Sequence, residues 1–263
     1  DIDILVHKED LEKAIRCLSV ELKYILKERT THDVSLFAPN GVHIELHFDL
    51  VEEGRANNAI KILSDVWEYV ALCENSGFCY EMFDEFFYFY HIAHMAKHFE
   101  NGGCGIRPFV DLVILEHKDG FDFAKRNALL DHGGLLQFAE ASRRLSRIWF
   151  EKEPWDELSE QMQNYILHGG SYGTTDNRVA VHQKQGKIQY ILSRMFIPYS
   201  KLKRYYPILE KHKWLMPIMQ VRRWFMLLDP SIMGMAKREI SVNGSISGDK
   251  IRDTQALLKN VGL

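Results

Sequence analysis

The first few residues constrain the fold of this chain most, because acidic and apolar side chains alternate there with a period of two. The chain opens Asp-Ile-Asp-Ile-Leu-Val, and this period is that of a β-strand. Ile2, Ile4 and Val6 then share one face of the strand, and Asp1 and Asp3 share the other. We expect a strand that packs on a core with one face and carries two carboxylates on the other.

A hairpin pattern predicts a second acidic strand. Residues 33–37 and 42–50 flank Pro39-Asn40-Gly41, a sequence typical of a tight turn. From Val42 to Leu50 every second residue is apolar, and we expect these residues to face the core. The positions between them carry ionisable side chains, namely His43, Glu45, His47 and Asp49.

From about residue 55 the chain has helical periodicity. The clearest helix is expected over residues 84–99, ended by Asn101-Gly102-Gly103. Other helices are expected at 11–18, 56–66, 108–116, 121–127, 135–150, 154–167, 177–195, 207–211, 217–228 and 250–259. Weaker strands are expected at 21–26 and 77–80, and a linker at 243–248.

These elements predict an α+β fold, in which a small mixed β-sheet precedes a larger all-α helical domain. We expect the sheet domain at residues 1–70 and the helical domain at 71–240. Residues 241–263 are expected to form a linker and a short terminal helix. Because Asp1 lies inside the strand pattern, we also expect further residues upstream of it.

Composition limits the class of protein. Of the 263 residues, 46% are hydrophobic and 26% are charged, as in globular proteins with a core. The formal net charge of −3 argues against nucleic acid as a partner, because nucleic-acid binders usually carry a basic excess. The four cysteines form no Cys-x-x-Cys pair, which disfavours a zinc or thioredoxin-type motif and fits a reducing cytoplasm. No apolar run approaches the roughly 18 residues of a transmembrane helix.

The carboxylates suggest a chemistry. Two Asp residues two apart on a strand lie about 7 Å apart at Cα and point the same way, so their oxygens can converge on hard cations. Glu45, on a similarly patterned strand, would complete the cluster. Mg²⁺, or Mn²⁺ in its place, prefers such oxygen ligands and can hold a triphosphate. The alternative is a solvent-facing strand edge, since short motifs often occur by chance.

A second polar group is predicted in the helical part. His91, His94 and His98 share one helix face by their spacing, and Arg107 and Asp111 are four residues apart and can pair. One interpretation is a pocket for a phosphate or an acceptor, with a histidine-metal hydrolase as a sharper variant. The other is a set of packed histidines and an ordinary ion pair. In the sheet, His47 could orient Glu45, touch substrate or simply cap a strand end.

The opening Asp-Ile-Asp-Ile-Leu-Val resembles the Asp-x-Asp strand of the DNA polymerase beta superfamily of nucleotidyltransferases. Residues 43–47 resemble the strand that supplies its third carboxylate. Residues 91–99 and 105–112 resemble a bacterial family called uncharacterised nucleotidyltransferases, as do shorter segments at 205–207, 214–217 and 222–224. The resemblance therefore extends to about residue 228. The superfamily's phosphate-holding Gly-Ser turn would lie upstream of Asp1.

This resemblance implies a nucleotidyltransferase core and an enzyme that moves a nucleoside monophosphate from a nucleoside triphosphate to an acceptor hydroxyl. The implied catalytic and metal-binding residues are Asp1, Asp3 and Glu45. The implied substrate-binding residues are His47, His94, His98, Arg107 and Asp111. The acceptor is left open between a small molecule, a saccharide and a protein side chain. The alternative is a catalytically inactive nucleotidyltransferase fold that serves as a binding or regulatory module for a protein partner.

Overall fold

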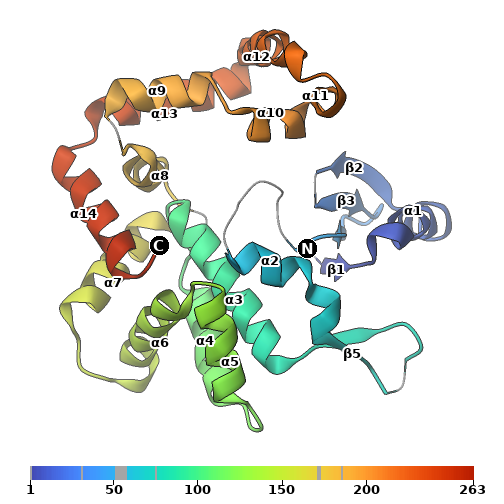
Figure 1. Cartoon of the computed structure of the whole chain (residues 1–263), viewed down its shortest axis with the longest axis vertical. Helices are drawn as coiled ribbons and strands as arrows, with labels where there is room; N and C mark the ends of the chain where they lie inside the picture. Colours follow the sequence, from blue (N-terminus) through green and yellow to red (C-terminus); the bar gives the residue numbers. More distant parts are fainter. Residues whose placement is uncertain (1, 31, 51–57, 75, 171–172, 185) are drawn as a thin grey trace. The chain divides into compact units, whose positions relative to one another are not determined.

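The computed structural model describes residues 2–30, 32–50, 58–74, 76–170, 173–184 and 186–263 (Figure 1). It divides into two compact units, Asp1–Val70 and Ala71–Leu263. Unit 1 contains the elements β1 (Ile2–Leu5), α1 (Leu11–Arg16), β2 (Ile25–Arg29), β3 (Asp33–Phe37), β4 (His43–His47) and α2 (Asn58–Ser64). Short turns of tighter or wider helix lie at Lys8–Asp10, Cys17–Glu21 and Val66–Tyr69.

Strands β1 to β4 form one mixed sheet in the order β1-β4-β3-β2. The predicted hairpin is present, since β3 and β4 pair antiparallel across the turn. β2 pairs antiparallel with β3, and β1 joins the other side of β4 in parallel. With the helices that follow, this sheet confirms the predicted α+β class.

One face of the sheet packs on α1. Leu11 of α1 and the strand residues Val34, Leu36 and Leu46 form a buried apolar cluster. The alternation of β3 and β4 places these strand residues on a single face, as the sequence predicts. Burial of such side chains away from water is the main stabilising term for a small sheet domain.

The prediction that every alternating apolar residue faces the core is less accurate for β1 and for the ends of β4. Ile2 and Ile4 pair with β4 residues of the buried face, yet both are largely exposed, because β1 is the edge strand of the sheet. β4 ends at His47 rather than at Leu50, and Val42 lies before its start and is exposed.

The strand expected at 21–26 is displaced along the chain. The turn that continues α1 runs through Cys17–Glu21, and Lys23 adopts the left-handed conformation with φ of 61°. A left-handed residue closes a helix end, so the extended strand begins only afterwards, at Ile25–Arg29.

The described residues of unit 2 are helical apart from a two-stranded sheet, formed by β5 (Val70–Leu72), which begins at the last residue of unit 1, and β6 (Tyr80–Met82). Its first helices are α3 (Asp84–Glu100), α4 (Arg107–Glu116), α5 (Phe123–His132), α6 (Leu136–Glu151) and α7 (Glu157–Gly169). They are followed by α8 (Thr175–His182), α9 (Lys187–Met195), α10 (Tyr199–Tyr205), α11 (Ile208–Lys211), α12 (Met216–Phe225), α13 (Pro230–Ser245) and α14 (Gly248–Asn260), with 3-10 turns at Lys213–Leu215 and Met226–Leu228. None of the described helices is both long and apolar enough to cross a bilayer.

Helix α3 confirms the clearest helical prediction and lies against α4, α5 and α6. One side of α3 is buried, through Phe86, Phe89, Ile92, Met95 and Phe99. Next to it, the fully buried guanidinium of Arg126 pairs with Glu116 at 2.7 Å. A buried charge of this kind requires its partner, so this ion pair ties α5 to α4.

Two predictions in the C-terminal part are wrong. The helix expected over 177–195 is two helices, α8 and α9, and Gly186 just before α9 has a φ of 94°. The linker expected at 243–248 is helical up to Ser245 as the end of α13. Asn243 is buried there and its side chain donates to the Lys187 carbonyl at 3.2 Å, a tertiary contact that local propensity does not reveal.

Replacing Leu36 by Ala should destabilise unit 1 by about 2–5 kcal/mol, because a fully buried side chain leaves a cavity. Urea unfolding followed by hydrogen exchange of peptides from residues 33–47 measures this unit separately. The matched control Leu22→Ala removes an exposed side chain and should change the free energy by about 0.5 kcal/mol or less. Equal effects of the two substitutions would contradict the assigned core.

Candidate active site

The face of the sheet opposite α1 carries the ionisable residues. The strand register places Asp3 beside Glu45, and Ser35 beside Glu45 on the other side. Because side chains alternate along each strand, His43 and His47 point to the same side as Glu45. Three strands thus bring their polar residues to one surface.

Asp3, Glu45 and His47 are the predicted residues that this surface brings together. The Nε2 atom of His47 lies 3.4 Å from Oδ1 of Asp3 and 3.6 Å from Oε2 of Glu45. One ligand atom from each residue lies within 4.8 Å of the others. The Asp3 side chain is 65% exposed and that of Glu45 is 29% exposed, so solvent reaches the group. Asp1 falls outside the described residues.

Glu45 lies between two histidines. The Nε2 atom of His43 is 3.7 Å from Oε1 of Glu45, on the side away from His47. His43 is itself fixed, since its ring stacks on Phe37 with centroids 4.2 Å apart and its Nε2 lies 3.2 Å from Oγ of Ser35. The carboxylate orientation is therefore set by neighbours from β3 and β4.

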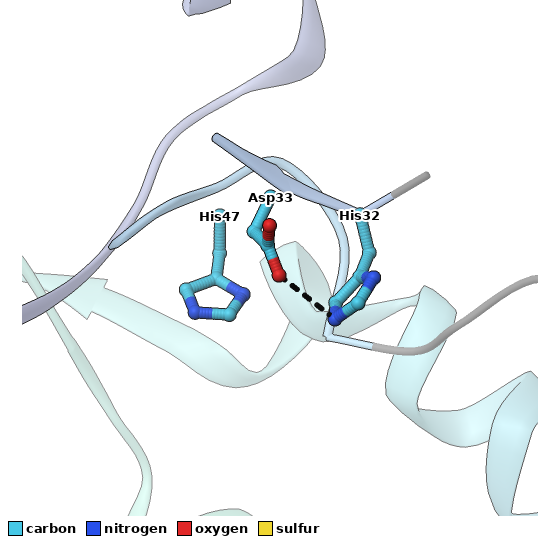
Figure 2. A group of neighbouring side chains, drawn as sticks. All are labelled: His32, Asp33 and His47. Atoms are coloured by element: carbon cyan, nitrogen blue, oxygen red, sulfur yellow. Dashed lines mark ion pairs between the residues drawn. The ribbon is translucent and has the colours of Figure 1, made fainter. Parts of the chain in front are cut away.

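His32 and Asp33 also reach this surface, which sequence reasoning missed. Figure 2 shows them beside His47, with an ion pair between Nε2 of His32 and Oδ2 of Asp33 at 3.0 Å. Asp33 is the direct cross-strand partner of His47. Counting outward from the Pro39-Asn40-Gly41 turn would have paired these two residues, so the signal was present in the hairpin.

In unit 2, His91 performs a structural task. Its Nε2 atom donates to the Pro108 carbonyl at 2.9 Å, which ties α3 to the first turn of α4. This contact agrees with the interpretation of His91 as a packed histidine.

His94 and His98 contact each other on α3. Their Nε2 atoms lie 3.2 Å apart and the rings meet edge to face. His94 keeps an exposed surface, yet partial desolvation by the protein around it lowers its pKa to about 4, helped by His98, Lys97 and His91 nearby. His94 is therefore a neutral imidazole near pH 7, which can exchange hydrogen bonds but supplies no positive charge to a phosphate.

Arg107 and Asp111 both lie on α4, where Arg107 is the first residue and is exposed. The ion pair that their spacing predicts is not seen between these two described side chains. An exposed pair of this kind gains little free energy, so spacing alone does not make it form.

The chain belongs to a family described as uncharacterised nucleotidyltransferase, whose model matches residues 1–151. The match includes the polar face of the sheet and the segment from His91 to Asp111. The resembling segments after residue 200 lie beyond it. No curated protein and no solved structure matches the chain significantly.

The proton affinity of His94 can be measured directly. NMR titration of the imidazole nitrogens should give His94 a pKa of about 4. Between the ordinary histidine pKa of 6.5 and this value the unfolded chain takes up a proton that the folded chain does not, so acidification through that window costs stability. In His98→Gln the pKa of His94 should rise, because a neighbouring charge is removed. Titration of His94 near pH 6.5 in the unmodified protein would contradict the lowered pKa.

Proposed function

We propose that the protein is a metal-dependent nucleotidyltransferase that moves a nucleoside monophosphate from a nucleoside triphosphate to an acceptor hydroxyl. The observation that carries this proposal is the convergence of Asp3, Glu45 and His47 on one face of the sheet. Membership of a nucleotidyltransferase family supports the general reaction.

The donor set fits a hard divalent cation. Asp3 and Glu45 are direct neighbours on adjacent strands and offer carboxylate oxygens, which Mg²⁺ and Mn²⁺ prefer. The strand period would bring Asp1 to the same face as a further ligand. Asp1, Asp3 and Glu45 would hold the ion, and the ion would offset the negative charge of the triphosphate.

The protein's own groups have separate tasks in this proposal. Asp3 is the more exposed carboxylate and faces incoming substrate. Glu45, held between His43 and His47, accepts the proton of the attacking hydroxyl. The surrounding imidazoles orient this carboxylate before substrate arrives, and such preorganised electrostatics is usually the largest part of catalysis. Release of pyrophosphate completes the transfer.

We also propose substrate-binding roles for the remaining predicted polar residues, considered separately in each unit. His47 contacts Asp3 and Glu45 and is placed to touch bound substrate. His94 and His98 would give and accept hydrogen bonds, Arg107 would attract an anionic group, and Asp111 would bind a hydroxyl. These roles are compatible with an acceptor hydroxyl on a small molecule, a saccharide or a protein side chain. The net charge of −3 speaks against nucleic acid.

A cytoplasmic location is part of the same proposal. All four cysteines carry free thiols, which is the usual state in a reducing compartment.

The reaction can be tested with the purified protein, Mg²⁺ and each labelled nucleoside triphosphate. Pyrophosphate release and a labelled product are expected. Asp3→Asn and Glu45→Gln should each lower the rate by about 100-fold or more, because each removes charge at the reacting centre. Mn²⁺ should replace Mg²⁺, and chelation should abolish the reaction.

Asp10→Asn is the matched control, since Asp10 is an exposed carboxylate of the same unit with no capping hydrogen bond to α1. It should leave the rate unchanged. Full activity of Asp3→Asn would refute the mechanism. Nucleotide binding without turnover would instead identify a binding or regulatory module.

A further inference from the structure

We propose that His32, Asp33 and His47 form a binding site for one transition-metal ion of the Zn²⁺ type, separate from the carboxylate pair of Asp3 and Glu45. One ligand atom from each of the three residues lies within 4.8 Å of the other two. Figure 2 shows the carboxylate of Asp33 between the two imidazole rings.

The three side chains come from a rigid part of the sheet. Asp33 begins β3 and lies directly across from His47, the last residue of β4. His32 precedes Asp33, and its carbonyl accepts the backbone N–H of Phe48 at 2.9 Å. Backbone hydrogen bonds on both strands therefore hold the donors in place, as a preformed metal site requires.

The hydrogen bonds around Thr30 fix the orientation of His32 and Asp33 toward each other. The Thr30 hydroxyl donates to Oδ1 of Asp33 at 2.9 Å and lies 3.2 Å from Nδ1 of His32. The hydroxyl oxygen also accepts the backbone N–H groups of His32 at 3.3 Å and of Asp33 at 3.2 Å. These contacts leave Nε2 of His32 facing Oδ2 of Asp33 at 3.0 Å. One possible ligand atom of each residue therefore points to the same place.

The same arrangement matches the support found around metal ligands. A metal-bound histidine usually donates its other ring nitrogen's hydrogen to a neighbour, which fixes the tautomer. The Thr30 hydroxyl lies at hydrogen-bond distance from Nδ1 of His32 and donates to the second oxygen of Asp33, so it stands where such a neighbour is needed. The side chains are only 16% exposed for His32 and 12% for Asp33, so few waters compete with an ion.

The donor set favours a borderline ion over Mg²⁺. Two imidazole nitrogens and one carboxylate are a common set for Zn²⁺ and similar ions, with water as a fourth ligand. Bonds of about 2.0 Å in a tetrahedral site separate the ligand atoms by about 3.3 Å. The 3.0 Å between His32 and Asp33 is already close to this separation, and a small rotation of His47 would close the site.

His47 links this site to the proposed nucleotide site. Its Nε2 atom lies 3.4 Å from Asp3, while its ring centroid is 5.8 Å from that of His32. An ion held by His32 and Asp33 would fix the orientation of this shared ring. The metal site is nevertheless independent of nucleotidyl transfer, because two of its three ligands play no part in that proposal.

The test is a titration of chelator-treated protein with Zn²⁺ by calorimetry and with Co²⁺ by visible absorption. One Zn²⁺ per chain should bind, and Co²⁺ should develop the d–d bands of a low-coordinate nitrogen and oxygen site. His32→Gln and Asp33→Asn should each weaken binding about tenfold or more and abolish those bands. The metal should raise the melting temperature of the unmodified protein but not of these variants.

Three variants distinguish this site from metal binding elsewhere on the chain. Asp3→Asn should lose nucleotidyl transfer but keep its Zn²⁺ affinity. Failure of the nucleotide proposal would therefore show in the transfer assay, and failure of the metal proposal in the Zn²⁺ titration. His94→Gln combined with His98→Gln should also keep it, as should His132→Gln at an exposed helix position. Far-UV circular dichroism of the metal-free variants shows whether each of them folds. If Asp33→Asn does not fold, the Zn²⁺ affinity of His32→Gln alone tests the proposed site.

Unchanged affinity in His32→Gln would overturn the proposal, as would loss of binding only in the His94 and His98 variant. Absence of Zn²⁺ binding by the unmodified protein would also overturn it.

Discussion

The antiparallel pairing of β3 with β4 is the constraint on which the rest of the N-terminal unit depends. It joins Val34 to Leu46 and Leu36 to Ile44 on one face, and Ser35 to Glu45 on the other. A slip of one residue would turn Glu45 and its histidines into the apolar core. The cost of burying those charges therefore fixes the register, and the register fixes the polar surface.

The possible metal-ligand atoms on that surface differ in type and in exposure from one edge to the other. At its β1 edge, exposed Asp3 and half-buried Glu45 offer hard carboxylate oxygens. At the start of β3, His32 and Asp33 offer a softer and less exposed pair. His47 lies between the two groups and contacts both carboxylates of the first. In the two proposals, this one histidine would belong to both groups, so its orientation would affect each of them.

The three histidines of α3 differ in their contacts. His91 donates a hydrogen bond to the Pro108 carbonyl, while His94 and His98 contact each other on α3. Low proton affinity at His94 makes it a hydrogen-bonding group rather than a cationic one. The same helix buries a row of aromatic and aliphatic side chains against its neighbours, so the backbone that carries these histidines is anchored in the core of unit 2.

Local periodicity in the sequence determined much of this protein. The period of two gave β1, β3 and β4 and assigned Glu45 and His47 to one face, and the helical period gave α3 almost to the residue. The family resemblance rested on those same segments. Such features follow from side-chain direction along a regular backbone, which depends on neighbours in the chain.

The tertiary structure decided which segments that are distant in sequence contact each other. Parallel pairing put Asp3 beside Glu45 and left Ile2 exposed at the sheet edge, which no local pattern reveals. Contacts with Lys187 kept Asn243 in a helix where its sequence reads as a linker. His32 and Asp33 joined His47 only because the hairpin closes, since bonds between strands connect residues that are distant in sequence.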